Sequence, residues 1–355
     1  MTGATLTQPP VQCTFLFVAV ALIAGLTLHL SASGFKLPAL FAIGLGLGVA
    51  LYHAAFGFTG AYRRAFQKRD ISGISAQLVM LAAAMFLFAP ILAEGRAFGH
   101  NVGGAIAPVS ISMAFGAFIF GVGMQLGGGC GSGTLFTVGG GSLRMVLTLI
   151  FFCFGGLWGS LDLEWWSSLP GIGSVAFGRM FGWGPAIALQ LLALGLIYLT
   201  LRRLGGRNKR PMWWDGGFSR QQLLRGPWPL LFSAGLLAIF NWATLLIAGH
   251  PWSITWGFTL WAAKAAMTLG WDVSSTWFWS GGFTDKALLR PVLEDVTSVM
   301  NIGIVFGAFL AASFAGKVAP KTTIPMRSML AAVIGGLLLG YGARLAYGCN
   351  IGAFF

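Results

Sequence analysis

Two related stretches of sequence organise this chain, GVGMQLGGGCGSGTLF at residues 121–136 and GYGARLAYGCNIGAFF at residues 340–355. Aligned on Cys130 and Cys349, they share the frame G-x-G-x5-G-C-x2-G, which combines a rare cysteine with glycines at matching positions. In each copy an apolar helix gives way to a glycine-rich loop that carries one thiol. We interpret the rest of the chain as a scaffold that brings the two loops together.

The composition of the chain excludes an ordinary soluble domain. Of its 355 residues, 56% are hydrophobic and 9% are charged, whereas about a quarter of the residues in soluble proteins are charged. Apolar runs of roughly 17–25 residues recur, and each is long enough to cross a bilayer as a helix. We therefore predict an all-α integral membrane protein with about nine transmembrane spans. They are expected at 12–30, 38–56, 74–92, 104–127, 142–160, 184–201, 228–248, 298–316 and 328–346.

The charged residues lie mostly in the links between spans, and their sorting sets the predicted topology. Links 57–73, 202–227 and 317–327 hold fourteen Lys and Arg against two acids, Asp70 and Asp215, whereas the other links hold seven of the nine acids. By the positive-inside rule the basic links are cytoplasmic, including the linker at about 202–227, and so is the N-terminus. This accounts for the net charge of +13. The predicted partner is therefore a lipid bilayer, and no nucleic-acid partner is expected.

This topology inverts the two halves of the chain. The span that leads into Cys130 runs from outside to inside, and the span that leads into Cys349 runs the other way. We predict a single transmembrane transporter domain over residues 1–355, with repeat 1 at about 38–160 and repeat 2 at about 228–355. Inverted repeats place the binding site at their interface.

Two further segments depend on this inversion. Gly-Phe-Thr occurs at 57–59 and again at 257–259, and basic residues follow each copy. A short apolar piece at 251–268 follows the seventh span closely, and it must be re-entrant if the charge sorting is to hold. The predicted fold is therefore an inverted-repeat bundle with re-entrant segments and two cysteine loops that dip into the membrane.

Such loops suit an anion. Irregular backbone at membrane depth requires protein or a polar cavity to satisfy its amides, and glycine lets several N–H groups turn toward one point. The predicted substrate-binding residues are Cys130, Cys349, Gly128, Gly129, Gly131, Gly133, Thr134, Gly348, Gly352 and Arg344. Glycine clusters also serve close helix packing, and buried cysteine also serves as a small hydrophobe, so packing stays open as the alternative.

Several single residues are secondary candidates. Arg344 precedes Cys349 by about one turn. A basic residue on an apolar span is costly and therefore suggests a functional role. Arg344 could attract an anion, or its side chain could extend to the membrane interface. Gln125 is a weaker candidate of the same kind, and Cys153 is expected to pack in the core, within reach of the Cys130 loop. The spans hold no paired carboxylates, no Ser/His/Asp set and no His/Cys metal cluster. We therefore predict no enzyme, no metal and no cofactor.

These residues resemble the YeeE/YedE family of bacterial inner-membrane proteins, whose characterised members take up thiosulfate. The segments that carry the resemblance are GFTGAYRR, GMQLGGGCGSGT, NWATLLIAG and GARLAYGCNIG. The resemblance implies an hourglass-shaped helical bundle in which cysteine S–H groups contact thiosulfate, and on that basis Cys130 and Cys349 are substrate-contacting. The family motif F-C-x-T-G reads Phe-Gly-Phe-Thr-Gly at 56–60. Gly57 therefore replaces a third cysteine, and Thr59 and Thr259 are secondary positions of the two Gly-Phe-Thr copies.

The leading hypothesis is the import of a small sulfur-containing anion, thiosulfate, past two neutral thiols. Another sulfur or selenium oxyanion, a sulfur-transfer protein that carries a persulfide, and a membrane subunit without cargo are the alternatives. A cytoplasmic sulfur-carrier protein is a further possible partner. Repeat 1 continues from Cys130 into the span 142–160, but repeat 2 has no such span after Cys349, so we expect that the sequence is truncated after Phe355.

Overall fold

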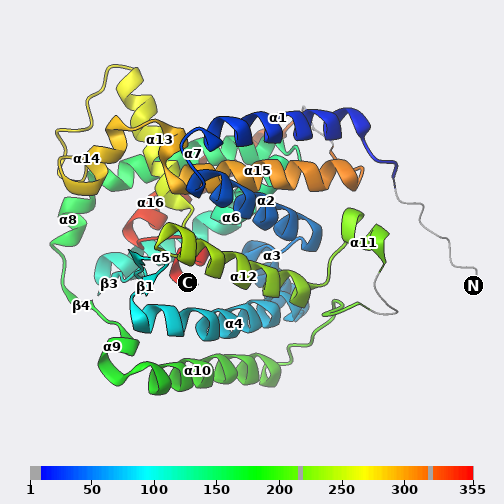
Figure 1. Ribbon diagram of the computed structural model, residues 1–355. Coiled ribbons are helices and arrows are strands. Elements are labelled where there is room, and N and C mark those ends of the chain that lie inside the picture. Colours follow the sequence, from blue (N-terminus) through cyan, green and yellow to red (C-terminus); the bar gives the residue numbers. More distant parts are fainter. Residues whose placement is uncertain (1–8, 215–218, 319–322, 355) are drawn as a thin grey trace, which may run out of the picture.

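The computed structural model describes residues 9–214, 219–318 and 323–354, and it is almost entirely helical (Figure 1). Asp215 and Lys321, which belong to the basic links, lie outside these residues. The helices are α1 (Cys13–Ser31), α2 (Lys36–Ala54), α3 (Phe58–Lys68), α4 (Ser72–Glu94), α5 (Ile111–Gly127), α6 (Gly131–Gly139), α7 (Leu143–Leu161), α8 (Leu163–Ser167), α9 (Phe177–Phe181), α10 (Trp183–Arg203), α11 (Arg220–Arg225), α12 (Leu230–Ala248), α13 (Thr255–Thr268), α14 (Gly282–Leu289), the 3-10 helix η1 (Val292–Glu294), α15 (Val296–Phe314), α16 (Met326–Leu345) and α17 (Asn350–Phe354). Strands β1 (Arg96–Ala97) and β2 (His100–Asn101) form one antiparallel pair, and β3 (Pro108–Ser110) and β4 (Gly171–Ser174) form another.

Nine helical stretches within the described residues are long and apolar enough to cross a membrane, and they coincide with the nine predicted spans. The prediction was wrong at the start of the span 104–127, because α5 begins at Ile111. Pro108 lies in β3, and Ser110 caps the helix by accepting a hydrogen bond from the Met113 amide at 3.2 Å. An N-cap serine satisfies one of the free amides of a first turn, which fixes where the helix begins.

The basic links and the acidic links lie at opposite ends of the bundle. In Figure 1 the N-terminal end, α3 and α11 lie on the right, whereas β1, β3, α8, α9 and α14 lie on the left. At the basic end, Lys209 Nζ donates a hydrogen bond to the Lys68 carbonyl at 2.6 Å, which joins link 57–73 to link 202–227. At the acidic end, the Gly103 amide donates to the Gly249 carbonyl at 3.0 Å. The separation of charge along the bundle is the one that the sequence predicted.

Asp70 holds the two basic links together. Its carboxylate accepts hydrogen bonds from the amides of Ser72 at 3.1 Å and Lys209 at 3.3 Å, and Arg64 Nε lies 3.7 Å away. Burial by itself raises the pKa of Asp70, but the hydrogen bonds of Ser72 and Lys209 and the charge of Arg64 outweigh it and hold that pKa below its ordinary value. The carboxylate is therefore stabilised in its charged form within this cationic face.

Helices α5 and α16 pack side by side and run antiparallel, as the inverted halves require. A methyl group added at Gly116 would lie 2.9 Å from the Gly342 carbonyl oxygen, and one added at Gly123 would lie 2.9 Å from the Gly335 carbonyl oxygen. The start of α5 therefore faces the end of α16. Because glycines line both sides, the two backbones approach closely, which is the usual way that membrane helices pack.

Helix α13 is re-entrant, as predicted for 251–268. The chain reaches the acidic end at Gly249, turns inward so that Ile254 lies beside Gly131, and returns along α13 to the same end. There Lys264 Nζ donates to the carbonyls of Leu288 and Arg290 at 2.6 Å each. Helix α3 has the inverted arrangement. It begins beside α6 and runs back to the basic end, where Lys68 lies.

The two Gly-Phe-Thr copies do not occupy equivalent turns of these helices. Gly57 is the N-cap of α3, so that Phe58 is its first residue, whereas α13 begins at Thr255 and Gly257 lies within its first turn. The two copies are therefore offset relative to the starts of their helices. Each copy nevertheless lies at the start of a helix that begins beside the cysteine loops. A match of three residues does not determine which turn of the helix those residues occupy.

Candidate functional site

Cys130 joins α5 to the short helix α6. Helix α5 ends at Gly128, whose φ of +87° suits glycine. Cys130 then caps α6: its Sγ accepts from the Gly133 amide at 3.4 Å and lies 3.4 Å from the Ser132 hydroxyl. Thr134 Oγ1 donates to the Cys130 carbonyl at 2.8 Å. The predicted glycines and threonine of this loop therefore hold the thiol in one place.

Cys349 occupies the corresponding position between α16 and α17. The chain reverses at Tyr347, which has a φ of 60°, and the Gly348 amide closes the turn on the Ala343 carbonyl at 2.9 Å. Cys349 is 2% exposed, and its neighbour Asn350 has a buried Oδ1 without a hydrogen-bond partner among the described residues. This loop therefore repeats the position of the first loop.

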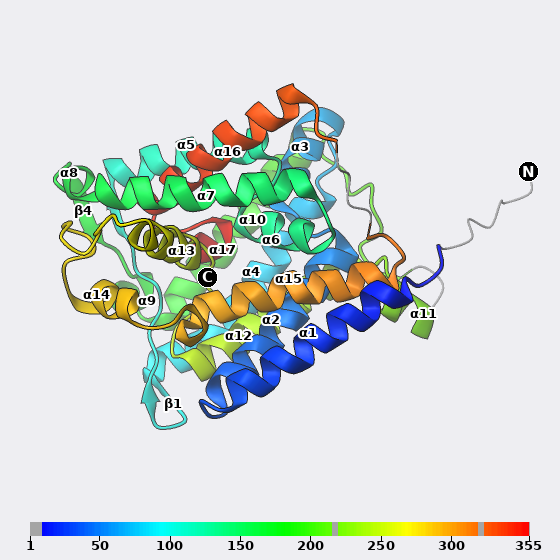
Figure 2. The same cartoon turned by 90° about the horizontal axis from the view of Figure 1, so that it is seen from above.

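The two loops meet although 219 residues separate their cysteines. A methyl group added at Gly131, directly after Cys130, would lie 3.2 Å from Cys349 Sγ and 3.2 Å from Ile254 Cγ2. The starts of α6, α13 and α17 are therefore in contact, and Figure 2 shows the short helices α6 and α17 at the centre of the bundle. The rest of the chain thus brings the two cysteine loops together, as the sequence predicted.

Helix α3 begins at the same point. The backbone amide of Phe58 is directed at the Cys130 sulfur, and a methyl group added at Gly57 would lie 3.8 Å from the ring of Phe136 in α6. Cys130 is fully buried and shares one apolar cluster with Phe58, Ile254 and Cys349. The starts of α3, α6, α13 and α17 thus meet in apolar surroundings around two free thiols, a place that we call the narrow point.

Comparison with known proteins agrees with this arrangement. The family model for sulphur transport matches residues 53–355, most of the chain. The chain belongs to the sulphur transport family. This confirms the resemblance to YeeE/YedE proteins.

Three relatives span different parts of the chain. The thiosulfate transporter TsuA of Spirochaeta thermophila is 26% identical over 330 residues, 88% of each chain. The probable transporters YedE of Escherichia coli K12 and Salmonella typhimurium LT2 are 33% and 32% identical over 129 residues, 36% of this chain. Those matches span 30% of the length of each YedE protein.

The remaining loop glycines of this sulphur transport protein serve different purposes. A side chain at Gly128 would meet Arg144 Nη1, and one at Gly129 would meet the methyl group of Met145. Glycine at these two positions therefore leaves room for the side chains that pack against the loop. A side chain at Gly133 would lie 3.5 Å from Cys130 Sγ, whereas one at Gly352 would meet none of the described atoms within 4 Å. The packing alternative thus holds for Gly128 and Gly129.

Arg144 is a residue that sequence reasoning missed. Its guanidinium donates to the carbonyls of Gly127 and Leu126 at 2.9 Å each, at the end of α5. These carbonyls have no partner within the helix, so Arg144 fixes the point where the Cys130 loop begins. The available signal was a base near the start of an apolar span, fourteen residues after Cys130.

Arg344 lies at the acidic end of α16. Its guanidinium carbon is 4.7 Å from the centre of the Phe278 ring, and Gly159 of α7 lies against its Cβ. The Arg344 Nε is buried and has no hydrogen-bond partner among the described residues. The ring therefore supports the cation, and a role of Arg344 in attracting an anion stays a prediction.

The secondary candidates are dispersed. Cys153 packs between two apolar clusters, as expected of a core residue. Thr259 Oγ1 donates to the Thr255 carbonyl at 3.1 Å, whereas the Thr59 hydroxyl is buried beside Phe58 without a partner among the described residues. Gln125 lines a cavity of about 430 Å³ together with Cys349. Of this group, Gly57, Thr59 and Gln125 lie near the thiols.

Proposed function

We propose that this protein imports a small sulfur-containing anion, thiosulfate, across the bacterial inner membrane past Cys130 and Cys349. The observation that carries the proposal is the contact of Cys349 Sγ with Gly131, which places both thiol loops at one narrow point. The 26% identity to a thiosulfate transporter over 88% of the chain supports the same cargo.

The chemistry of the narrow point suits a passing anion. Thiol S–H groups are weak donors, and the amides at the starts of α3 and α6 are directed at the Cys130 sulfur. A conducted ion must bind well enough to enter and loosely enough to leave. Neutral thiols fulfil this condition, because a thiolate would repel the anion.

Burial of both thiols favours transport over persulfide transfer. A persulfide carrier requires an accessible, reactive thiolate, but Cys130 is 0% and Cys349 2% exposed. Alkylation of the full chain near neutral pH separates the two functions. We expect slow labelling of both residues relative to the exposed Cys13, and labelling as fast as that of Cys13 would favour the persulfide carrier.

The proposed orientation in the membrane rests on charge. The basic links 57–73 and 202–227 lie together at one end of the bundle, and the positive-inside rule makes that end, and the N-terminus, cytoplasmic. The same cationic face would suit an acidic cytoplasmic sulfur-carrier protein. Attachment of a reporter at either terminal segment of α1 tests the orientation.

The decisive experiment is uptake of labelled thiosulfate into cells that lack their own sulfur importers. We expect Cys130→Ala combined with Cys349→Ala to abolish uptake while the protein remains in the membrane. Cys13→Ala is the matched control, because Cys13 is exposed at the start of α1. Undiminished uptake by the double variant would refute the proposal.

A panel of competitors tests the cargo. Excess sulfite, sulfate or selenite is added during uptake of labelled thiosulfate by the unaltered protein. We expect thiosulfate itself to compete best. Absence of thiosulfate uptake, together with cysteine-dependent uptake of a competitor, would assign another sulfur or selenium oxyanion.

A further inference from the structure

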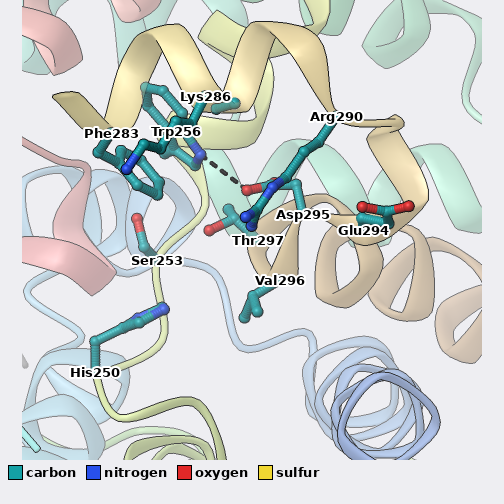
Figure 3. Close-up of a pocket in the computed structure, with 11 residues that line it drawn as sticks. His250, Ser253, Trp256, Phe283, Lys286, Arg290, Glu294, Asp295, Val296 and Thr297 are labelled. Carbon is teal, nitrogen blue, oxygen red and sulfur yellow. Dashed lines mark hydrogen bonds between the residues drawn. The ribbon is translucent and has the colours of Figure 1, made fainter. Parts of the chain in front are cut away.

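A short irregular loop lies beside the cysteines on the acidic side of the narrow point. Residues 251–254 have no regular secondary structure, and they join the end of α12 to the start of α13. His250 and Ser253 line a cavity of about 400 Å³ at the acidic end of the bundle (Figure 3). Ile254 is not part of that lining, and its Cγ2 lies against Gly131 of the first cysteine loop. Ile254 therefore lies between the cavity and the cysteine loops.

Ile254 fills space at the narrow point that the other half of the chain leaves open. It directly precedes α13, as Gly57 precedes α3 and Cys130 precedes α6. Its side chain is 1% exposed and packs in the apolar cluster that contains both thiols. A methyl group added at Gly57 would have Phe136 as its nearest described neighbour, at 3.8 Å. The two re-entrant helices thus begin after unlike residues, glycine on the basic side and isoleucine on the acidic side.

Two asparagines fix the loop that carries Ile254. Asn241 of α12 accepts a hydrogen bond from the Trp252 amide at 2.7 Å, and Asn301 of α15 donates one to the Ile254 carbonyl at 2.9 Å. Irregular backbone at membrane depth needs such partners, because lipid supplies none. The loop is therefore attached to two membrane spans, at Ile254 itself and two residues before it.

The cost of these asparagines argues for a role beyond packing. Both are 0% exposed, and Asn241 Nδ2 and Asn301 Oδ1 have no hydrogen-bond partner among the described residues. A buried polar atom without a partner destabilises a fold. A methyl group at Gly257 would lie 2.9 Å from Asn301 Nδ2, so the glycine of the second Gly-Phe-Thr copy leaves room for that amide to reach Ile254. Asn241, Asn301 and Gly257 thus act together on the position of Ile254.

We propose that Ile254 closes the passage on the acidic side of the cysteine loops and sets the size of the anion that passes, with Asn241 and Asn301 as positioning residues. Isoleucine is branched at Cβ and has few rotamers, so its side chain stays in place once the backbone is fixed. A hydrophobic constriction keeps water out of a pathway and so opposes the passage of hydrated ions. The passage of an anion rests on the proposed function, whereas the access of a reagent to the thiols does not.

The first test measures how fast a small charged thiol reagent, sulfonatoethyl methanethiosulfonate, labels each cysteine of the full chain in nanodiscs. Mass spectrometry resolves the sites, and the exposed Cys13 is the internal reference. We expect Ile254→Ala to speed the labelling of Cys349 roughly tenfold, because the loss of a buried side chain leaves a cavity beside the sulfur. Ile254→Val should give a smaller rise, and Ile254→Phe should slow the labelling. Ile71→Ala is the matched control, because Ile71 is 2% exposed and packs beside Gly206 at the basic end.

The second test separates positioning from stability. Asn301→Leu is similar in size and cannot donate to Ile254, so it should speed the labelling of Cys349 as Ile254→Ala does. Its control is Ser313→Ala, because the Ser313 hydroxyl is also buried in α15 but donates to the Phe309 carbonyl of its own helix. In uptake, Ile254→Ala should raise the saturating rate with little change of the KM. It should also admit labelled benzenesulfonate, a larger sulfur oxyanion that the unaltered protein should exclude.

The outcomes distinguish this proposal from the proposed function. Unchanged labelling of Cys349 in Ile254→Ala, or an equal rise in Ile71→Ala, would overturn the closing role of Ile254. Unchanged labelling in Asn301→Leu would overturn the positioning role of Asn301. Faster labelling in Ile254→Ala, together with no thiosulfate uptake by the unaltered protein, would instead refute the proposed function and leave the closing role of Ile254 in place.

Discussion

Helices α5 and α16 have related sequences and unequal surroundings. With Cys130 and Cys349 aligned, Gly121 of α5 corresponds to Gly340 of α16. Gly340 packs against α7, and a Cβ there would overlap the carbonyl oxygen of Phe152. A Cβ at Gly121 would meet nothing within 4 Å, because the equivalent face of α5 lines a groove.

The other glycine face is alike in both helices. Gly116 and Gly123 of α5 correspond to Gly335 and Gly342 of α16, and the four glycines pack against one another across the pseudo-symmetric interface. Two glycine pairs thus serve the contact between α5 and α16, whereas in the pair Gly121 and Gly340 only Gly340 is covered by a neighbouring helix. A repeated glycine therefore shows where another helix can pack closely. Whether a helix packs there depends on the rest of the fold, as the difference between Gly340 and Gly121 shows.

The largest difference in stability is expected between the matched variants Gly340→Val and Gly121→Val. Gly340→Val should destabilise the protein by about 3 kcal/mol or more, because the added atoms meet the backbone of α7, which cannot rotate away. Gly121→Val should change stability by less than about 0.5 kcal/mol. Thermal unfolding in detergent, followed by size-exclusion chromatography, measures both. Equal destabilisation of the two variants would show that the groove beside Gly121 is closed in the membrane.

A smaller effect is expected where the two cysteine loops meet. Gly131→Ala places a methyl group 3.2 Å from Cys349 Sγ and from Ile254, so the loops must separate. Uptake should decline roughly tenfold, because displacement of weakly bound groups by fractions of an ångström disrupts their common geometry. Gly235→Ala in α12, whose added methyl group would meet none of the described atoms within 4 Å, is the control and should transport normally. If both variants transport alike, the contact at Gly131 does not matter for passage.

The smallest structural effect is expected at the start of α3. Gly57 has extended backbone angles, φ −114° and ψ 131°, and a side chain there would first meet Phe136 at 3.8 Å. Gly57→Cys should therefore change stability by less than about 0.5 kcal/mol and add a third thiol beside Cys130. Thiosulfate uptake should equal or exceed that of the native protein.

The control for this variant is Gly57→Ser, which matches cysteine in shape and lacks its sulfur. A gain with cysteine and none with serine would assign the effect to the thiol. A loss of uptake with both, at unchanged stability, would contradict the conclusion that this position has room for a side chain.

Much of the architecture could be predicted from the sequence. The spans were predictable because hydrocarbon burial requires long apolar runs, and their sorting into two ends followed from the Lys and Arg of the links. The pairing of Cys130 with Cys349 was predictable because cysteine is rare in this chain, which has four. These are properties of composition and order, which a sequence carries directly.

Only the tertiary structure decided the contacts. It placed Cys349 against Gly131 and brought Arg144 to the end of α5, where its guanidinium binds the last carbonyls of that helix. It also separated Gly340, which is covered by α7, from Gly121, which is not. Each of these facts depends on which distant segment packs at a given place. Glycine allows such close packing because it has no side chain. For the same reason, a glycine in the sequence does not reveal which helix packs against it.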